Sequence, residues 1–421
     1  MARRYFGTDG VRGVVDEFLT PSLVERLGRA ASLWTGAAKV FVGRDTRASG
    51  VELEEAFARG VVSAGGDCIV GGVLPTPAVA LAALDLGVVI SASHNPPEYN
   101  GVKFFDSHGR KLSDRAEEQI EELLSAAPGV DQGRIEHVEI APDSYLDHVL
   151  ERFGQDLEGL RVVVDCANGA YSGLAPGAFE QCGAVVHAIG DAPNGRNINV
   201  GCGATDLALL QRTVRELGFD VGIAFDGDGD RMLAVDERGE AVDGDQIVAV
   251  LALDLGVDQV AVTVMTNLGF HALMRERDIV VHTTDVGDRY VLEALHREGG
   301  LLGGEQSGHI IYLQDHVTGD GLAAGLLLCG ALRGRPLSEV AGVMQRWPQS
   351  KENVRVEDRE LSPEVVREVE RLNAEWNGQG RVLVRPSGTE PLVRVLAEAE
   401  NAAVAEEACA TIAALVRREL G

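Results

Sequence analysis

The segment that decides the fold reads V-G-I-A-F-D-G-D-G-D-R and occupies residues 221–231. Its first five residues are apolar or small, a pattern that predicts a strand buried on both faces. Aspartates and glycines follow at once, and buried strands that run into polar loops are typical of parallel α/β proteins. Ligands of open α/β sheets collect at the carboxyl ends of the strands, so we expect the chemistry of this protein in such loops.

The same rhythm runs through most of the chain. Short β-branched or aliphatic runs alternate with helical stretches of roughly 10–15 residues, which predicts an α/β fold with parallel sheets. A chain of 421 residues provides for several domains at roughly 100–200 residues each. The other strand candidates are residues 40–43, 68–71, 88–91, 161–165, 185–189, 260–264 and 279–282.

Two stretches predict joints between domains. Residues 126–143 carry proline and glycine and lack helical periodicity, and residues 347–363 are charged and interrupt the α/β alternation. The last part of the chain reads strand, helix, strand, strand, helix, which predicts a smaller α+β domain. We therefore place domains at 1–150, 151–250, 251–362 and 363–421, with strands at 381–384 and 392–397 and a helix at 402–418 in the last one.

Composition narrows the class of partners. The formal net charge of −27 disfavours binding to nucleic acid or to an anionic membrane surface. A phosphorylated ligand remains compatible, because charges are screened beyond about 8 Å and a few arginines can form a local basic pocket. The six cysteines show no C-x-x-C pair, and no apolar run approaches the roughly 18 residues of a membrane span. With no apolar signal-peptide core at the start, we expect a cytoplasmic protein with reduced cysteines.

The acidic loop predicts a metal site. Asp226, Asp228 and Asp230 stand at every second position, and the glycines between them let the backbone curl so that the three carboxylates converge. Oxygen ligands of this kind suit a hard divalent cation such as Mg²⁺. A calcium loop is the obvious alternative, but Arg231 occupies the position where that loop requires glycine. A solvated acidic turn is the other alternative, and it would concentrate charge repulsion without compensation.

A second polar loop, S-A-S-H-N-P at residues 91–96, also follows an apolar strand. It places Ser93 beside His94 at a strand end, although taken alone it is equally compatible with an ordinary turn. The sequence is no G-x-S-x-G elbow, so a Ser-His-Asp hydrolase has little support.

Three further loops carry polar groups. Residues 303–309, G-G-E-Q-S-G-H, taken alone favour a plain β-turn. Residues 385–391, R-P-S-G-T-E-P, with Arg394 just beyond, combine guanidinium, hydroxyl and glycine-exposed N–H groups into a nest suited to phosphate, with an ordinary turn as the alternative. Residues 6–13, F-G-T-D-G-V-R-G, surround Arg12 with glycines that permit close approach of an anion.

Taken together and in this order, the loops S-A-S-H-N-P, D-G-D-G-D-R, G-E-Q-S-G-H and R-P-S-G-T-E-P resemble those of the α-D-phosphohexomutase superfamily. The opening Y-F-G-T-D-G-V-R-G, the N-I-N at 197–199 with Cys202-Gly203, and V-G-D-R-Y-V at 286–291 resemble the branch that acts on glucosamine phosphate. The resemblance implies three topologically similar α/β domains around a central cleft plus a smaller C-terminal α+β domain, with one loop from each domain.

The resemblance also assigns roles to individual residues. It implies that Ser93 carries a covalent phosphate and that this phosphate and the three aspartates hold one Mg²⁺ per chain. Lys103 lies in N-G-V-K, the superfamily's N-G-x-K pattern, and only four of the 38 cationic residues are lysines. The implied catalytic residues are Ser93, Arg12, His94, Lys103 and Arg231; the metal ligands are Ser93, Asp226, Asp228 and Asp230; the sugar-binding residues are Glu305, Ser307 and His309; and the phosphate-binding residues are Arg385, Ser387, Gly388, Thr389 and Arg394.

The function implied is an isomerase that interconverts glucosamine 6-phosphate and glucosamine 1-phosphate through a bisphosphorylated sugar, feeding UDP-N-acetylglucosamine and cell-wall precursor synthesis. Glucose or mannose phosphate is the nearest alternative substrate, and Gln306, where those mutases tend to have methionine, favours glucosamine. A noncatalytic phosphosugar sensor and a Mg²⁺-dependent phosphatase are the alternatives from other classes. The expected partner is a small phosphosugar, with no nucleic acid and no membrane, and the protein is expected to be a monomer or a homodimer.

Overall fold

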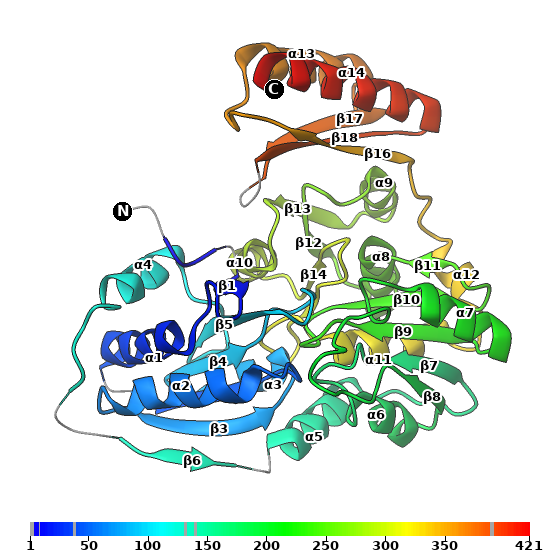
Figure 1. Cartoon of the computed structure of the whole chain (residues 1–421). Coiled ribbons are helices and arrows are strands. Elements are labelled where there is room, and N and C mark those ends of the chain that lie inside the picture. The colour runs from blue at the N-terminus through cyan, green and yellow to red at the C-terminus, as the bar shows by residue number, and fades with distance from the viewer. Residues whose placement is uncertain (1–3, 8, 37–38, 130–132, 139–140, 388–390) are drawn as a thin grey trace. The chain divides into compact units, whose positions relative to one another are not determined.

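The computed structural model describes residues 4–7, 9–36, 39–129, 133–138, 141–387 and 391–421. The chain forms two compact units. Unit 1 consists of Met1–Met265 and Ile279–Val343, and unit 2 consists of Thr266–Asp278 and Met344–Gly421. Each unit is described by itself (Figure 1). The four-domain division at 150, 250 and 362 stays a prediction.

The first sheet of unit 1 has the strand order β1-β5-β4-β2-β3-β6. Strands β2, β3 and β4 are parallel to one another, whereas β5 runs antiparallel to β4 and β1 antiparallel to β5. The strands are β1 (Val11–Val14), β2 (Lys39–Arg44), β3 (Asp67–Val73), β4 (Leu86–Ile90), β5 (Tyr99–Asp106) and β6 (Ile135–His137), and the helices are α1 (Pro21–Thr35), α2 (Gly50–Val62), α3 (Thr76–Leu81), α4 (Asp114–Glu122) and α5 (Ala141–Phe153).

Helix α1 illustrates how local sequence sets the limits of an element. Thr20 accepts a hydrogen bond from the backbone N–H of Leu23 at 3.2 Å, and Pro21 follows at the first helical position, where its missing N–H costs nothing. The helix ends at Thr35, and the capping residue Gly36 has a φ of 81°, in the left-handed region that glycine adopts readily. Its apolar stripe then packs on the sheet.

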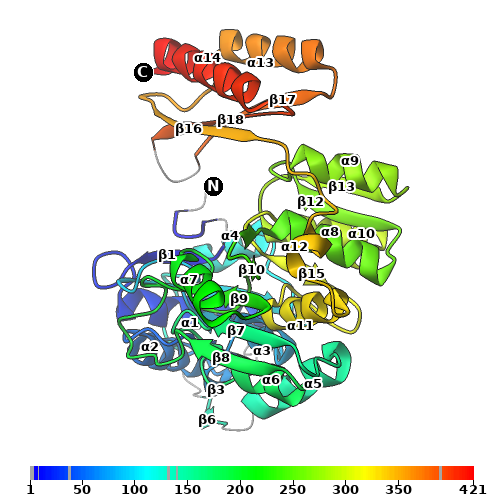
Figure 2. The same cartoon turned by 90° about the vertical axis from the view of Figure 1, so that its right-hand side faces the viewer.

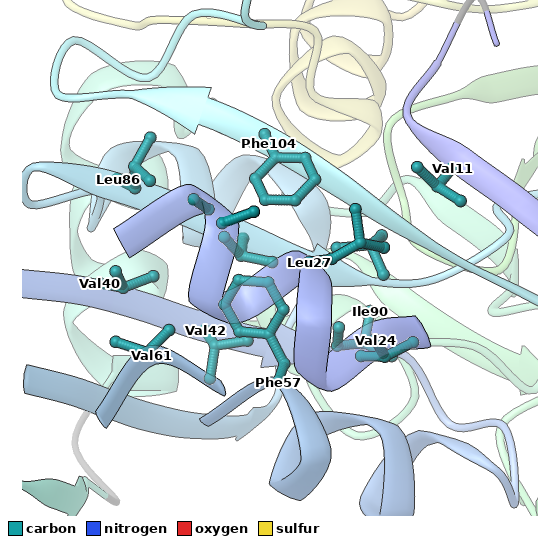
Figure 3. Close-up of a cluster of buried hydrophobic side chains, with 14 of the residues drawn as sticks. Val11, Val24, Leu27, Val40, Val42, Phe57, Val61, Leu86, Ile90 and Phe104 are labelled. Carbon is teal, nitrogen blue, oxygen red and sulfur yellow. The ribbon is translucent and has the colours of Figure 1, made fainter. Parts of the chain in front are cut away.

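The core of this sheet lies between β2, β4 and β5 on one side and α1 and α2 on the other. Figure 3 shows Leu27 of α1 and Phe57 of α2 gathered with Val42 and Phe104 of the strands, and all four are buried. The rings of Phe57 and Phe104 lie 6.0 Å apart. This packing holds β4 and β5, and therefore the loop between them, in a fixed place.

The second and third sheets of unit 1 follow the same plan. Their strand orders are β11-β10-β9-β7-β8 and β13-β12-β14-β15. The second contains β7 (Arg161–Asp165), β8 (Val185–Ile189), β9 (Val221–Phe225), β10 (Met232–Asp236) and β11 (Ala241–Val242), with helices α6 (Ala175–Gln181) and α7 (Ala208–Leu217). The third contains β12 (Gln259–Thr263), β13 (Val280–Thr284), β14 (Leu302–Gly304) and β15 (Ile310–Tyr312), with α8 (Gly244–Leu255), α10 (Asp288–Glu298), α11 (Gly321–Leu332) and α12 (Leu337–Ala341).

All three sheets share one topology. Three parallel strands stand in the order second, first, third, and a fourth strand returns antiparallel beside the third. Similarity among three α/β domains is thereby confirmed. Each sheet is mixed, because β5, β10 and β15 each follow a loop too short for a crossover helix, and a short loop returns the chain antiparallel.

Unit 2 is a three-stranded antiparallel sheet of order β16-β18-β17, with α13 and α14 on one face (Figure 2). Its elements are β16 (Gln349–Arg355), α13 (Pro363–Trp376), β17 (Gly380–Pro386), β18 (Leu392–Ala399) and α14 (Ala402–Leu420). Helix α9 (Leu268–Glu276) also belongs to unit 2. The predicted order of strand, helix, strand, strand, helix is present, but its first strand, β16, lies within residues 347–363, which were predicted to form a joint between domains. Among the helices of the described residues, none combines the length and the apolar character needed to cross a membrane.

Candidate functional site

Three of the four predicted loops occupy equivalent positions in the three sheets of unit 1. Residues 91–98 connect β4 to β5, residues 226–231 connect β9 to β10, and residues 305–309 connect β14 to β15. Each loop therefore joins the third parallel strand to the antiparallel fourth strand. The repeated topology delivers one polar loop per sheet. Ser93 of the first loop donates a hydrogen bond to Asp226 of the second, and His309 of the third lies 3.8 Å from Asp230 of the second, so the three loops meet.

The acidic loop brings its carboxylates together. One oxygen each from Asp226, Asp228 and Asp230 lies within 4.8 Å of the others, and all three side chains are buried. Within the described part of the chain, Asp228 Oδ1 and Asp230 Oδ1 accept no hydrogen bond. Burial, together with the neighbouring charges of Asp230 and Asp228, raises the pKa of Asp226 to about 8. Buried, unpartnered carboxylate oxygens in such proximity fit a hard divalent cation.

Two glycines allow this loop its close packing. A side chain at Gly227 would meet the carbonyl oxygen of Ser93 at 2.7 Å. Gly229 has a φ of 75°, and its Cβ would lie 2.3 Å from the Tyr171 ring. The alternation of aspartate with glycine thus serves both the convergence of the carboxylates and the approach of neighbouring segments.

Ser93 reaches across to the acidic loop. Its Oγ donates a hydrogen bond to Asp226 Oδ2 at 2.6 Å and lies 3.1 Å from His94 Nδ1. The side chain is 1% exposed, and the residue has a φ of 53°, which is uncommon for a residue other than glycine. Burial lowers the pKa of His94 to about 4, helped by the nearby charges of Arg231 and Arg12, so its imidazole is neutral at pH 7.

Lys103 on β5 enters the same cluster. Its Nζ lies 2.7 Å from Asp228 Oδ2, 2.9 Å from Asp230 Oδ2 and 3.4 Å from Asp9 Oδ2. Burial alone would lower the pKa of the ammonium group, but these carboxylates raise it above its ordinary value. The lysine is therefore a permanent positive charge among the aspartates.

The two arginines among the predicted catalytic residues, Arg12 and Arg231, lie beside this cluster. Arg12 on β1 forms an ion pair with Asp9, and β1 pairs with β5 so that Arg12 lies opposite Gly101. Arg231 donates its backbone N–H to Asp226 Oδ1 at 3.2 Å, and its guanidinium is 25% exposed. Burial lowers the pKa of Arg231, yet Asp230 and Asp226 raise it by more, so it stays charged. Both can therefore offer positive charge to an anion.

The loop at residues 305–309 presents groups of different exposure. Glu305 is nearly buried and accepts the backbone N–H of Gly287 at 3.1 Å, whereas Ser307 is exposed and lies 3.5 Å from Glu305 Oε2. His309 is 2% exposed, with Nδ1 3.8 Å from Asp230 Oδ1. The predicted contact of Glu305, Ser307 and His309 with a sugar stays a prediction, and His309 lies between Asp230 of the acidic loop and Asp288.

The fourth predicted loop belongs to unit 2 and connects β17 to β18. Arg385 and Arg394 stand directly opposite each other in the antiparallel register, on one face of the sheet. Two guanidinium groups in this arrangement can bind one anion between them. Ser387 is buried, and its carbonyl accepts a hydrogen bond from Arg359 Nη1 at 3.0 Å. Gly388 and Thr389 lie outside the described residues.

Several charged residues around the acidic loop were missing from the predicted set. Lys111 Nζ lies 2.6 Å from both Asp9 Oδ1 and Asp288 Oδ2, and Asp288 Oδ2 lies 3.3 Å from His309 Nε2. Thr76 donates its hydroxyl to Asp228 Oδ2 at 2.7 Å. The scarcity of lysine is the one signal in the sequence that could have drawn attention to Lys111.

Models of protein families match the chain in four consecutive segments. The matches are to the phosphoglucomutase/phosphomannomutase alpha/beta/alpha domains I, II and III and to the C-terminal domain of the same family, over residues 3–128, 143–239, 243–347 and 352–415 respectively. The chain belongs to the phosphoglucomutase/phosphomannomutase family.

Curated relatives specify the branch of this family. A protein of Moorella thermoacetica named phosphoglucosamine mutase is 49% identical over 94% of this chain and 95% of its own length. Another of that name, from Desulforudis audaxviator, is 47% identical over 99% of both chains. The similarity extends over nearly the whole chain.

Solved structures support the fold. A phosphoglucomutase/phosphomannomutase family protein of Burkholderia thailandensis covers 99% of this chain and 98% of its own with a TM-score of 0.85 at 24% identity. The N-acetylphosphoglucosamine mutase of Aspergillus fumigatus, in complex with GlcNAc-6P and magnesium, covers 99% of this chain and 96% of its own with a TM-score of 0.73 at 20% identity.

Proposed function

We propose that this protein is a phosphoglucosamine mutase, an isomerase that interconverts glucosamine 6-phosphate and glucosamine 1-phosphate. The observation that carries the proposal is the meeting of Ser93 with the acidic triad: its hydroxyl lies 2.6 Å from Asp226, beside three carboxylates and the ammonium of Lys103. Relatives named phosphoglucosamine mutase at 47–49% identity over nearly the full chain support the same activity.

In the proposed reaction Ser93 carries a phosphate and transfers it to the free hydroxyl of the sugar monophosphate. The P–O bond to Ser93 breaks, a P–O bond to the sugar forms, and the proton of the sugar hydroxyl ends on Ser93 Oγ. The resulting bisphosphorylated sugar reverses its orientation and returns its other phosphate to Ser93. His94 Nδ1, neutral and 3.1 Å from Ser93 Oγ, is placed to accept the serine proton in that return step.

Phosphoryl transfer depends on in-line positioning and on neutralising the charge of the phosphoryl oxygens. Asp226, Asp228 and Asp230 would hold Mg²⁺, which supplies Lewis-acid stabilisation of that charge when bound. Lys103, Arg12 and Arg231 contribute fixed positive charge beside the triad.

A mutase of this kind must bind its substrate in two orientations. Arg385 and Arg394 would hold the nonreacting phosphate with Ser387, Gly388 and Thr389, because guanidinium groups recognise a phosphate without reading the carbon that bears it. Glu305, Ser307 and His309 would contact the sugar.

A phosphorus NMR time course on glucosamine 6-phosphate with Mg²⁺ tests the reaction. We expect the 6-phosphate signal to decline while the 1-phosphate signal grows, with no accumulation of inorganic phosphate. A growing phosphate signal without the 1-phosphate would instead identify a phosphatase.

Variants connect the reaction to the site. Ser93→Ala should keep its fold and lose nearly all mutase activity. Peptide mapping of the protein without substitutions should locate a phosphate on Ser93. Asp230→Asn should retain the fold and weaken the dependence of the rate on Mg²⁺, because it removes one charged ligand. Full activity in Ser93→Ala would exclude the phosphoserine route.

The sugar preference calls for competition kinetics with glucosamine, glucose and mannose 6-phosphates. Gln306 donates its side-chain amide to Asp243 Oδ2 at 3.4 Å, a contact that methionine could not make. We expect the highest kcat/KM for glucosamine 6-phosphate and a smaller margin in Gln306→Met. A preference for mannose or glucose phosphate would favour the alternative substrate with the same mechanism. We further propose a cytoplasmic protein, active as a monomer or a homodimer.

A further inference from the structure

Two carbonyl groups of the serine loop are held from two sides. Arg47 Nη2 donates to the carbonyl oxygens of Ser93 at 3.0 Å and Asn95 at 2.7 Å. Asn199 Nδ2 donates to the same two oxygens, at 2.9 Å and 3.2 Å. Arg47 comes from the segment after β2, whereas Asn199 comes from the segment between β8 and α7 of the second sheet. The backbone that carries Ser93 is therefore fixed jointly by residues of two different sheets.

Arg47 is itself held in a defined orientation. Its side chain is fully buried, and its Nε donates to Asp45 Oδ2 at 2.9 Å. The same carboxylate oxygen accepts the hydroxyl of Ser91 at 2.6 Å, and that hydroxyl accepts the backbone N–H of Ser93 at 2.8 Å. Both the N–H and the C=O of Ser93 are thus connected to the Asp45–Arg47 pair.

All three nitrogens of the Arg47 guanidinium donate hydrogen bonds. Besides the contacts of Nε and Nη2, Nη1 donates to the carbonyl oxygens of Pro96 and Tyr99, the latter at 2.9 Å. The guanidinium thereby lies inside the turn from Ser93 to Tyr99 and binds four of its carbonyl groups. A lysine ammonium, a point charge on a flexible stem, cannot span these carbonyls in one plane.

These contacts act on a strained residue. Ser93 has a φ of 53°, a conformation that costs free energy in a residue other than glycine and persists only where its surroundings enforce it. A buried ion pair is by itself a poor source of stability, because both charges lose their hydration. The Asp45–Arg47 pair is therefore better explained by its fixing of the Ser93 backbone than by a contribution to the free energy of folding.

The acidic loop packs on the same feature. A Cβ at Gly227 would meet both the carbonyl oxygen of Ser93 at 2.7 Å and Asn199 Nδ2 at 2.9 Å. A shift of the clamped carbonyls would consequently displace Ser93 Oγ relative to Asp226, the contact on which phosphoryl transfer depends. Misplacement of reacting groups by about 1 Å can lower a rate by about 100-fold.

We propose that Arg47, oriented by Asp45, and Asn199 are positioning residues that clamp the carbonyls of Ser93 and Asn95 and so aim the Ser93 hydroxyl at the acidic triad. The inference rests on the proposed function, because it assigns these residues to the transfer step carried by Ser93. Neither residue is expected to contact the sugar, so their loss should act on kcat and leave KM nearly unchanged.

The test compares Arg47→Lys and Asn199→Ala with Arg44→Lys in the full-length protein. Arg44 is the matched control, because it is the last residue of β2, just before the segment that carries Arg47, and it directs its side-chain hydrogen bonds to Glu54 and to the carbonyl of Asp45. We expect kcat to fall about 100-fold in Arg47→Lys and about tenfold in Asn199→Ala, with KM within about twofold of the unmodified protein. Arg44→Lys should keep kcat and lose only stability.

Hydrogen exchange supplies a readout that does not depend on activity. Peptides covering residues 91–99 should exchange faster in Arg47→Lys and Asn199→Ala than in the unmodified protein, and at an unchanged rate in Arg44→Lys. If the unmodified protein isomerises the sugar while both clamp variants keep kcat and the exchange rate of this loop, the clamp is refuted. Absence of isomerisation by the unmodified protein would refute the proposed function instead, with the exchange result still deciding whether the clamp exists. Asn199→Ala keeps the test decisive if Arg47→Lys does not fold.

Discussion

Replacement of Lys103 by methionine should destabilise the protein strongly. The ammonium group lies 2.7 Å and 2.9 Å from carboxylates of Asp228 and Asp230 and is 1% exposed. Methionine preserves most of the side-chain volume and removes the charge, so the change isolates electrostatics from packing. The carboxylates would remain buried with one compensating charge fewer.

The expected size of the effect follows from this geometry. At an effective dielectric constant of about 20, one contact at about 4 Å contributes about 4 kcal/mol of attraction, and the contacts of Lys103 are shorter. The desolvation of the ammonium group, several kcal/mol, offsets much of this gain in the unmodified protein. Removal of one partner from a buried pair costs about 3–5 kcal/mol, because the remaining charges stay buried without compensation. With a slope of about 3 kcal/mol per M, the urea midpoint should fall by about 1–2 M.

Urea unfolding monitored by circular dichroism measures this loss, once with EDTA and once with Mg²⁺. The decrease should be smaller with Mg²⁺, because a cation at the triad restores positive charge beside the same carboxylates. Lys39→Met is the control, because Lys39 is exposed at the start of β2. The Lys39→Met protein should unfold at an unchanged urea midpoint. A Lys103→Met protein as stable as the unmodified one in EDTA would refute the reasoning, since the buried carboxylates would then not need the ammonium.

Three other expectations follow from particular contacts. Gly229→Ala should lower the free energy of unfolding by about 1–3 kcal/mol and weaken Mg²⁺ binding in calorimetry, because φ is 75° and a Cβ would lie 2.3 Å from Tyr171; unchanged metal affinity would contradict this. Burial raises the pKa of Asp165 to about 6, so the native protein holds this proton more tightly than the unfolded chain; relative to Asp165→Asn, its free energy of unfolding should fall by about 2 kcal/mol as the pH rises from 4 to 7, and parallel pH profiles would exclude the shift. Arg394→Gln should raise KM for the sugar phosphate about tenfold or more with a smaller effect on kcat, because Arg394 faces Arg385 across the strand pair, and a KM equal to that of the unmodified protein would remove Arg394 from the phosphate site.

Local patterns in the sequence determined much of the fold and the identity of the acidic site. The buried strand at 221–225 and the aspartates at every second position after it were readable because strand periodicity and loop spacing are properties of neighbouring residues. The same holds for the order of elements in unit 2. The alternating aspartates and glycines therefore predicted converging carboxylates, and the carboxylates do converge.

Only the tertiary structure decided which distant residues complete the site. Lys103 and Asp228 are 125 positions apart, and Asn199 and Ser93 are 106 positions apart, so their contacts exist only because the sheets pack together. The antiparallel strand β5 could not be predicted from the sequence, because its residues Tyr99–Asp106 include asparagine, glycine and lysine. A polar side chain is buried in a strand only when residues from other segments pair with it. Arg47 looks like an ordinary surface arginine in the sequence. Its full burial is tolerated because one carboxylate and four carbonyl groups surround it, and no pattern of neighbouring residues encodes that meeting.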